Sequence, residues 1–220
     1  MSSTTKVRIW DAPIRLYHWA LVLLIGGSWI TQWKGWMNLH FLFGETILAL
    51  LLFRLIWGLV GSDSARFRTF LKSPAAVLRY LSKLHRRGPD TELGHNAAGG
   101  WMVLVLLGLL LLQVGTGLFA NDDDSLTEGP LRHLVSKGAS DFLSRMHGFA
   151  FTAIEIAVIL HVAAIVAYLV LKGHNLIRPM ITGTKRIPEP VAAPKLASLA
   201  RAIVVLCAAA FAVVAMLRFL

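Results

Sequence analysis

The sequence has one cysteine and few charged residues. Cys207 stands alone among the 220 residues, which excludes an intramolecular disulfide, a CxxC redox pair and a metal site built from several thiolates. Charged residues make up only 15% of the chain, whereas hydrophobic residues make up 56%, and the mean hydropathy is +0.64. This balance lies far outside that of an ordinary soluble domain. We therefore expect an integral membrane protein.

Five apolar stretches approach or exceed the length of about 20 residues that a helix needs to cross a bilayer. They cover residues 14–33, 39–60, 97–120, 142–171 and 196–217. The fifth has a short, alanine-rich core, so both a transmembrane and an interfacial helix fit it. The pattern predicts an all-α fold, in which an integral membrane four-helix bundle is followed by a fifth, C-terminal transmembrane or interfacial helix.

The net charge of +10 does not indicate a nucleic-acid partner, because the basic residues lie in loops that flank apolar stretches and not on a separate soluble domain. If the N-terminus is inside, 16 of the 22 Lys and Arg residues fall in inner segments, as expected for cytoplasmic loops. The sequence therefore predicts a multi-pass protein in contact with membrane lipid, with a cytoplasmic N-terminus and a periplasmic C-terminus.

The chain shows no long linker and no internal repeat. A short amphipathic helix is expected after Pro74, in the inner loop, with a solvated basic loop as the alternative. Pro188, Pro190 and Pro194 predict an extended connection before the fifth stretch. The predicted divisions are a four-helix domain at 1–178, a Pro-containing cytoplasmic linker at 179–195 and an additional hydrophobic helix at 196–220.

Four of the eight histidines lie near the ends of predicted spans. His147 and His161 are 14 residues apart, nearly four helical turns, so their imidazoles share one side of a helix about 21 Å apart. A tight turn between the first two stretches places His40 at the outer level of His147. His18 and His161 lie at a common depth, roughly 22–24 Å below the outer surface. The sequence predicts an outer pair, His40 with His147, and an inner pair, His18 with His161.

Paired imidazoles on opposing helices indicate two iron porphyrins. Neutral imidazole is a good iron ligand, and two such rings leave a slot that suits a flat macrocycle. A lone membrane histidine is more often explained by helix-to-helix hydrogen bonding, but four residues matched in depth are not. Zinc fits less well, because each level supplies only two ligands. Since the CxxCH attachment motif is absent, we expect two haem b groups, one held by each pair.

Short sequence motifs surround these histidines, and they follow one another along the chain. Residues 7–19 read Val-Arg-Ile-Trp-Asp-Ala-Pro-Ile-Arg-Leu-Tyr-His-Trp, and they are followed by Leu39-His40 with Gly44, Arg54 before Trp57-Gly58, Gly94-His95-Asn96, and Arg145-Met146-His147 with His161. Over about residues 6–178 the ordered set resembles the bacterial cytochrome b561 and nickel-iron hydrogenase b-type cytochrome family. The fifth stretch departs from the four-helix pattern of that family.

The resemblance implies a dihaem cytochrome b of the bacterial inner membrane. In that family the matched residues His18, His40, His147 and His161 ligate two haems within a four-helix bundle. The protein would then carry electrons between quinone and a redox partner, such as a periplasmic cytochrome c or a hydrogenase. With imidazoles on both faces of each iron, outer-sphere electron transfer is the expected chemistry.

Two other functions remain open at this point. One is a superoxide:quinone oxidoreductase, in which the outer haem accepts an electron directly from a small periplasmic substrate. The other, of a different class, is a haem-free transporter or structural membrane subunit. An optical spectrum separates the haem-free function from the others, and reduction assays with superoxide and cytochrome c separate the remaining two.

Two further polar residues are candidates for cofactor binding. Arg54, near the inner end of the second stretch, could pair with a propionate of the inner haem, with snorkelling to the membrane surface as the alternative. His95 opens the third stretch on the inner side. It could bind a propionate or move protons for quinone chemistry, and a plain polar residue at a helix end is the alternative.

The outer loop after the third stretch is acidic, with Asp122, Asp123, Asp124 and Glu128 close to the proposed outer haem. Such a cluster could steer a basic electron-transfer protein by long-range attraction. A solvated turn that merely follows the charge rule for membrane topology is the alternative.

Overall fold

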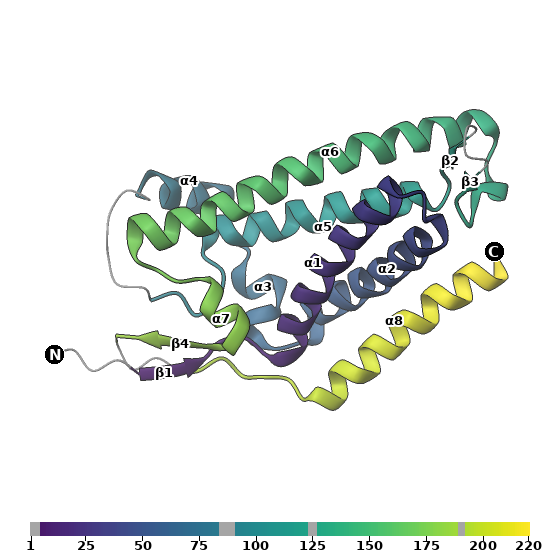
Figure 1. Cartoon of the computed structure of the whole chain (residues 1–220). Coiled ribbons are helices and arrows are strands. Elements are labelled where there is room, and N and C mark those ends of the chain that lie inside the picture. Colours follow the sequence, from purple (N-terminus) through teal and green to yellow (C-terminus); the bar gives the residue numbers. More distant parts are fainter. Residues whose placement is uncertain (1–4, 84–90, 123–126, 189–191) are drawn as a thin grey trace. The chain divides into compact units, whose positions relative to one another are not determined.

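The computed structural model describes residues 5–83, 91–122, 127–188 and 192–220, and these residues are mostly helical (Figure 1). Five of the described helices are long and apolar enough to cross a membrane. They are α1 (Ala12–Trp33), α2 (Met37–Val60), α5 (Ala97–Gly117), α6 (Lys137–Ala167) and α8 (Leu199–Phe219). The predicted all-α membrane fold is confirmed, and each long helix coincides with one predicted stretch.

Side-chain caps explain where the helices begin. Asp11 precedes α1, and its Oδ1 accepts a hydrogen bond from the backbone N–H of Ile14 at 2.7 Å. The other carboxylate oxygen of Asp11 accepts from the indole N–H of Trp57 at 3.1 Å. Ser136 caps α6 through its contact with the N–H of Ala139, so α6 begins at Lys137, before the apolar stretch that starts at residue 142.

A left-handed residue closes each of two turns. Gly35, with φ of 69°, lies between α1 and α2, where the N–H of Trp36 donates to the carbonyl of Thr31. Gly173, with φ of 72°, follows the π-helical turn η3 (Tyr168–Lys172) that ends α6. These glycines permit the chain to reverse directly after a long helix.

Several short elements complete the chain. They are the 3₁₀ turns η1 (Asp63–Ala65) and η2 (Arg132–Leu134), the helices α3 (Phe67–Phe70), α4 (Pro74–Ser82) and α7 (Ile177–Thr182), and the strands β1 (Thr5–Arg8), β2 (Asn121–Asp122), β3 (Thr127–Glu128) and β4 (Thr184–Ile187). The helix expected after Pro74 is α4, and Ser73 caps it by accepting from the N–H of Ala76. The sequence analysis did not predict the strands, which contain two or four residues each.

The strands form two antiparallel pairs. β1 pairs with β4, and β2 pairs with β3 in a hairpin. The strands of the first pair lie side by side in Figure 1, with Lys6 directly opposite Arg186 and Val7 opposite Lys185. Pairing of β4 therefore gives regular structure to residues that the sequence analysis assigned to a linker.

The chain divides into two compact units. The first consists of Met1–Leu16, Leu55–Val105 and Val158–Ala202, and the second of Tyr17–Arg54, Leu106–Ala157 and Ile203–Leu220. The first unit buries Trp57, Ala65 and Ile187 completely. The second unit buries Leu51 and Ala150 completely and contains the cavity described below.

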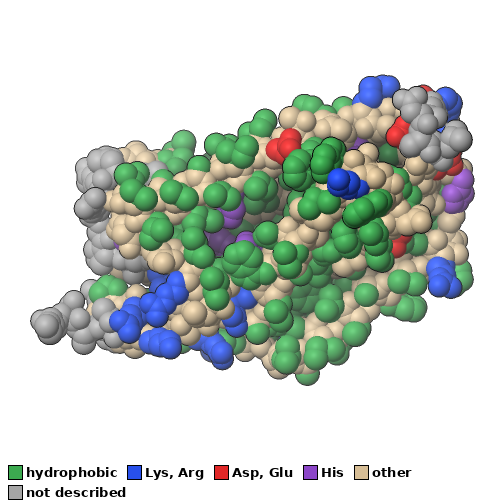
Figure 2. Space-filling model, viewed as in Figure 1, with side chains coloured by type: hydrophobic (Ala, Val, Ile, Leu, Met, Phe, Trp, Pro, Cys, Tyr) green, Lys and Arg blue, Asp and Glu red, His purple; other side chains and the backbone are tan. Residues whose placement is uncertain are grey.

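Large apolar side chains cover the outer faces of the helices (Figure 2). Leu23, Leu59, Val170 and Phe211 are among those exposed. Exposed apolar surface of this extent needs a lipid or protein neighbour, and helices satisfy their own backbone hydrogen bonds in lipid. The helices therefore present the surface of an integral membrane protein.

Candidate functional site

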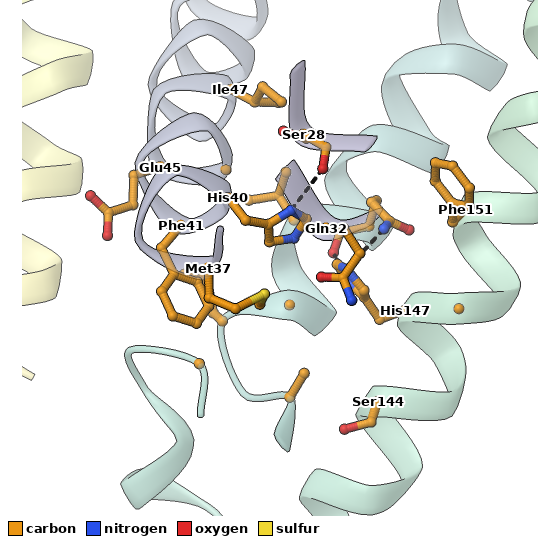
Figure 3. A pocket seen from close by; sticks show the side chains of 18 of the residues that line it. Ser28, Gln32, Met37, His40, Phe41, Glu45, Ile47, Ser144, His147 and Phe151 are labelled. Atoms are coloured by element: carbon orange, nitrogen blue, oxygen red, sulfur yellow. Dashed lines mark hydrogen bonds between the residues drawn. The ribbon is translucent and has the colours of Figure 1, made fainter. Parts of the chain in front are cut away.

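Two of the predicted histidines meet in the second unit. His40 comes from the first turn of α2 and His147 from α6, and both side chains enter one pocket (Figure 3). Their ring centroids are 6.4 Å apart and their planes make an angle of 77°. The structure thus brings together two imidazoles whose residues are more than 100 positions apart in the sequence.

The pocket has a volume of about 440 Å³. Side chains of α1, α2, α5 and α6 line it, together with the β2–β3 hairpin, and most of them are apolar. Glu45 also lines it, but Figure 3 shows that its carboxylate points away from the two histidines. A largely apolar cavity with two convergent imidazoles is typical of a cofactor site.

The backbone of α1 fixes the tautomer of His40. Its Nδ1 lies 2.9 Å from the carbonyl oxygen of Ser28, and because a carbonyl can only accept, Nδ1 donates. Thr31 donates its hydroxyl to the same carbonyl at 3.0 Å. Nε2 of His40 therefore keeps the lone pair that a metal ligand needs.

The residue Gln113 of α5 contacts His147 twice. Nδ1 of His147 donates to the backbone carbonyl of Gln113 at 2.8 Å. The side-chain amide of Gln113 lies 3.0 Å from Nε2 of His147, to which it donates. The lone pair that accepts this second bond is the one a metal would use, so metal ligation at Nε2 requires the Gln113 amide to move.

Glycines shape the pocket around these rings. A Cβ on Gly117 would lie 2.8 Å from Cε1 of His147, so the imidazole occupies the space that a larger residue would fill. A Cβ on Gly44 or Gly148 would meet no atom within 4 Å, although both residues line the pocket. Open space beside the backbone allows a flat group to approach it closely.

The distance between the two rings fits two imidazoles that ligate one metal ion. A ligating imidazole nitrogen lies about 2 Å from its metal, and adding about 1 Å for each half-ring gives a centroid separation of roughly 6 Å. The measured 6.4 Å agrees with this value. Among the described residues, no three His, Cys, Asp or Glu side chains gather as a metal site of the zinc type.

The residues of the proposed inner pair lie in different units. His18, on α1, belongs to the second unit, where its ring contacts that of Trp19. His161, on α6, belongs to the first unit. Both are half-buried. Their pairing therefore stays a prediction, whereas the position of His147 and His161 on one continuous helix agrees with the sequence analysis.

Arg54 and His95 also lie in different units. Arg54 is only 3% exposed within α2, which argues against a side chain that snorkels to the membrane surface. The ring of His95 packs 4.8 Å from that of Trp10 and 4.7 Å from that of Phe70. Asn96, and not His95, caps α5 by accepting from the N–H of Gly99.

The acidic loop is only partly described. Asp122 and Glu128 are exposed on the β2–β3 hairpin, and Asp122 lines the pocket. Asp123 and Asp124 lie outside the described residues. The hairpin thus carries negative charge at the pocket that contains His40 and His147.

Sequence reasoning missed the residues that orient the two histidines. Gln113 is the only amide in the predicted stretch 97–120, and this is a usable signal because a polar side chain within the membrane is costly. Ser28 acts through its backbone carbonyl, for which a sequence pattern gives no signal.

Comparison with known proteins agrees with this site. The family model described as prokaryotic cytochrome b561 matches residues 9–183. A probable Ni/Fe-hydrogenase 1 B-type cytochrome subunit of Escherichia coli strain K12 is 22% identical over 209 residues, covering 80% of this chain and 88% of the relative, and its counterpart from strain O157:H7 gives the same values. No solved structure matches the chain. The chain belongs to the prokaryotic cytochrome b561 family, a family of haem b proteins that transfer electrons in membranes.

Proposed function

We propose that the chain is a dihaem cytochrome b that transfers electrons across the bacterial inner membrane between quinone and a periplasmic redox partner. The observation that carries this proposal is the His40–His147 pair, 6.4 Å apart in a cavity of about 440 Å³. A haem-free transporter or structural subunit would not explain why two imidazoles converge in an apolar cavity.

In this proposal His40 and His147 hold the outer haem by their Nε2 atoms. The bound haem would supply a one-electron iron couple. The carbonyls of Ser28 and Gln113 accept the Nδ1 protons, which fixes both tautomers and increases the basicity of Nε2. The Gln113 amide, which donates to Nε2 of His147 in the structure, would have to turn away for this nitrogen to hold the haem.

The inner haem is assigned to His18 and His161 in the same proposal. Arg54 and His95 are the candidates to bind its propionates. Arg54 is buried, and a guanidinium can donate two parallel hydrogen bonds to the oxygens of a propionate. His95 could also serve proton exchange with quinone.

The haem content of the purified protein tests this proposal. We expect about two haem b groups per chain by pyridine haemochrome analysis, from the two imidazole pairs. A content of one haem per chain would contradict the assignment of a second haem to His18 and His161. No haem would contradict the electron-transfer function itself.

The proposed partner is a redox protein on the outer side, where the hairpin exposes Asp122 and Glu128. The E. coli relative is named as a probable hydrogenase cytochrome subunit, which supports a protein partner for this chain. A periplasmic cytochrome c with a basic surface would fit the acidic hairpin by charge complementarity.

Neutralising the hairpin should slow electron exchange with such a partner. In Asp122→Asn combined with Glu128→Gln, we expect a several-fold lower rate with a basic cytochrome c at low salt, measured by stopped-flow absorbance. The difference should vanish above 0.1 M salt, where screening limits the field to about 10 Å. Glu92→Gln, in the first unit, is the control. Equal rates at low salt for all three proteins would exclude this hairpin as the docking surface.

A further inference from the structure

A second cavity, of about 230 Å³, lies in the first unit. Its wall is built from the residues after α6 together with α7, β4 and β1. The four cations that line it are Lys6, Arg178, Lys185 and Arg186. Figure 2 shows Lys and Arg side chains gathered in the region that β1, β4 and α7 occupy in Figure 1.

Like charges lie close together at this cavity. Lys6 and Arg186 lie directly opposite each other in the β1–β4 ladder, where like charges destabilise the pair. Lys185 is only 9% exposed, and its ammonium donates to the backbone carbonyl of Glu92 at 2.8 Å. In the part of the chain that the structure describes, no carboxylate lines this cavity. The cavity therefore carries net positive charge, which favours the binding of an anion.

The polar groups of the wall suit phosphate oxygens. The guanidinium of Arg178 can donate two parallel hydrogen bonds to a phosphate, and lysine ammonium groups add compact charge. Asn175 accepts from the N–H of Arg178 through Oδ1, which leaves its amide NH₂ as a donor. The side chains of His174 and Thr184 add further groups that can donate.

The cavity also adjoins apolar surface at the end of a membrane-spanning helix. Gly173 and His174, which line it, directly follow η3 at the end of α6. Leu171 on η3 is exposed, as are Ile177 and Ile181 on α7. A basic cavity beside exposed apolar side chains matches the two parts of an anionic phospholipid, its headgroup and its acyl chains.

We infer that this cavity is a phosphate-binding site, which takes the headgroup of an anionic phospholipid or a free phosphate ion. The charge rule for membrane topology accounts for basic residues near a membrane, but it does not require them to line a common cavity or to bury a lysine. The site is independent of the haem pairs, because it shares no residue with them.

The test uses the detergent-purified, haem-loaded full chain. The variant Lys6→Gln with Arg186→Gln removes two charges of the cavity. The control, Arg8→Gln with Arg79→Gln, removes two exposed charges that do not line it, and Arg8 lies on the same strand as Lys6. Native mass spectrometry measures binding of phosphatidylglycerol and phosphatidylcholine, and thermal unfolding measures stabilisation by inorganic phosphate.

We expect the unaltered protein and the control to bind phosphatidylglycerol at least ten times more tightly than phosphatidylcholine, and the cavity variant to lose this preference. Stabilisation by inorganic phosphate without a lipid preference would assign the site to free phosphate. Without added ligand, the cavity variant should unfold no earlier than the control, because it loses the Lys6–Arg186 repulsion. The inference is overturned if neither ligand binds, or if the cavity variant and the control bind equally. An unchanged haem spectrum shows that the variants are folded.

Discussion

Replacing His147 with alanine should remove the outer haem, so that the haem content falls from about two per chain to about one. His40→Ala should have the same effect, because a single imidazole from the facing helix cannot supply both axial ligands. The measurement is pyridine haemochrome stoichiometry together with the reduced-minus-oxidised spectrum. The two variants should lose the same spectral component, since the two rings lie 6.4 Å apart in one pocket.

The other pair and an unrelated histidine supply the controls. His18→Ala and His161→Ala should both remove the second spectral component, that of the inner haem. His133→Ala should leave both haems in place, because His133 lies on η2 and its Nε2 bonds to the carbonyl of Leu220. If His40→Ala and His18→Ala lose the same component, the proposed pairing is wrong.

The long helices could be predicted because hydrophobic length alone determines them. Stretches of about 20 apolar residues have few stable conformations in lipid other than a helix. The ends were less predictable. α6 starts at Lys137 because Ser136 caps it, although its first turn is polar and lies outside the apolar stretch.

The β1–β4 pair could not be predicted from the sequence. Each strand has four residues, and the two are separated by more than 170 residues. Each strand contains two basic residues, which is typical of solvated segments that set membrane topology. The strands are brought together by tertiary contacts, such as the hydrogen bonds from the backbone N–H groups of Ile9 and Trp10 to the carbonyl of Gly183. The local sequence of either strand does not indicate these contacts.

The candidate site could be predicted in part for a physical reason. Helical periodicity fixes where a side chain lies along its helix, so the shared level of His40 and His147 follows from residue counting. The groups that orient their rings do not follow from it, because Ser28 acts through a backbone carbonyl and Gln113 through both its backbone and its side chain. Helical periodicity therefore identifies the candidate ligands, whereas the hydrogen-bond partners of their rings can be identified only from the structure.

Adding one methyl group at Gly117 should weaken binding of the proposed outer haem without replacing either of its proposed ligands. In Gly117→Ala the new Cβ would lie 2.8 Å from Cε1 of His147, which is closer than Cβ atoms normally approach, and 3.0 Å from Nδ1, which is a tight contact. The imidazole must shift, and its 2.8 Å hydrogen bond to the Gln113 carbonyl is then strained or lost. Changes at partners that orient a metal-ligating histidine typically cost 10–100-fold in affinity. We expect a loss of this order for the outer haem.

Gly115→Ala is the matched control for this variant. Gly115 lies two residues away on the same helix, and a Cβ there would meet no atom within 4 Å. Alanine is favoured over glycine within a helix by about 1 kcal/mol, so the control should be at least as stable as the unaltered protein and keep both haems. Haem stoichiometry and the rate of haem loss to excess apomyoglobin distinguish the two variants. If Gly117→Ala retains the outer haem as firmly as Gly115→Ala does, close packing of α5 against His147 does not position this ligand, and the Gln113 carbonyl is not what orients it.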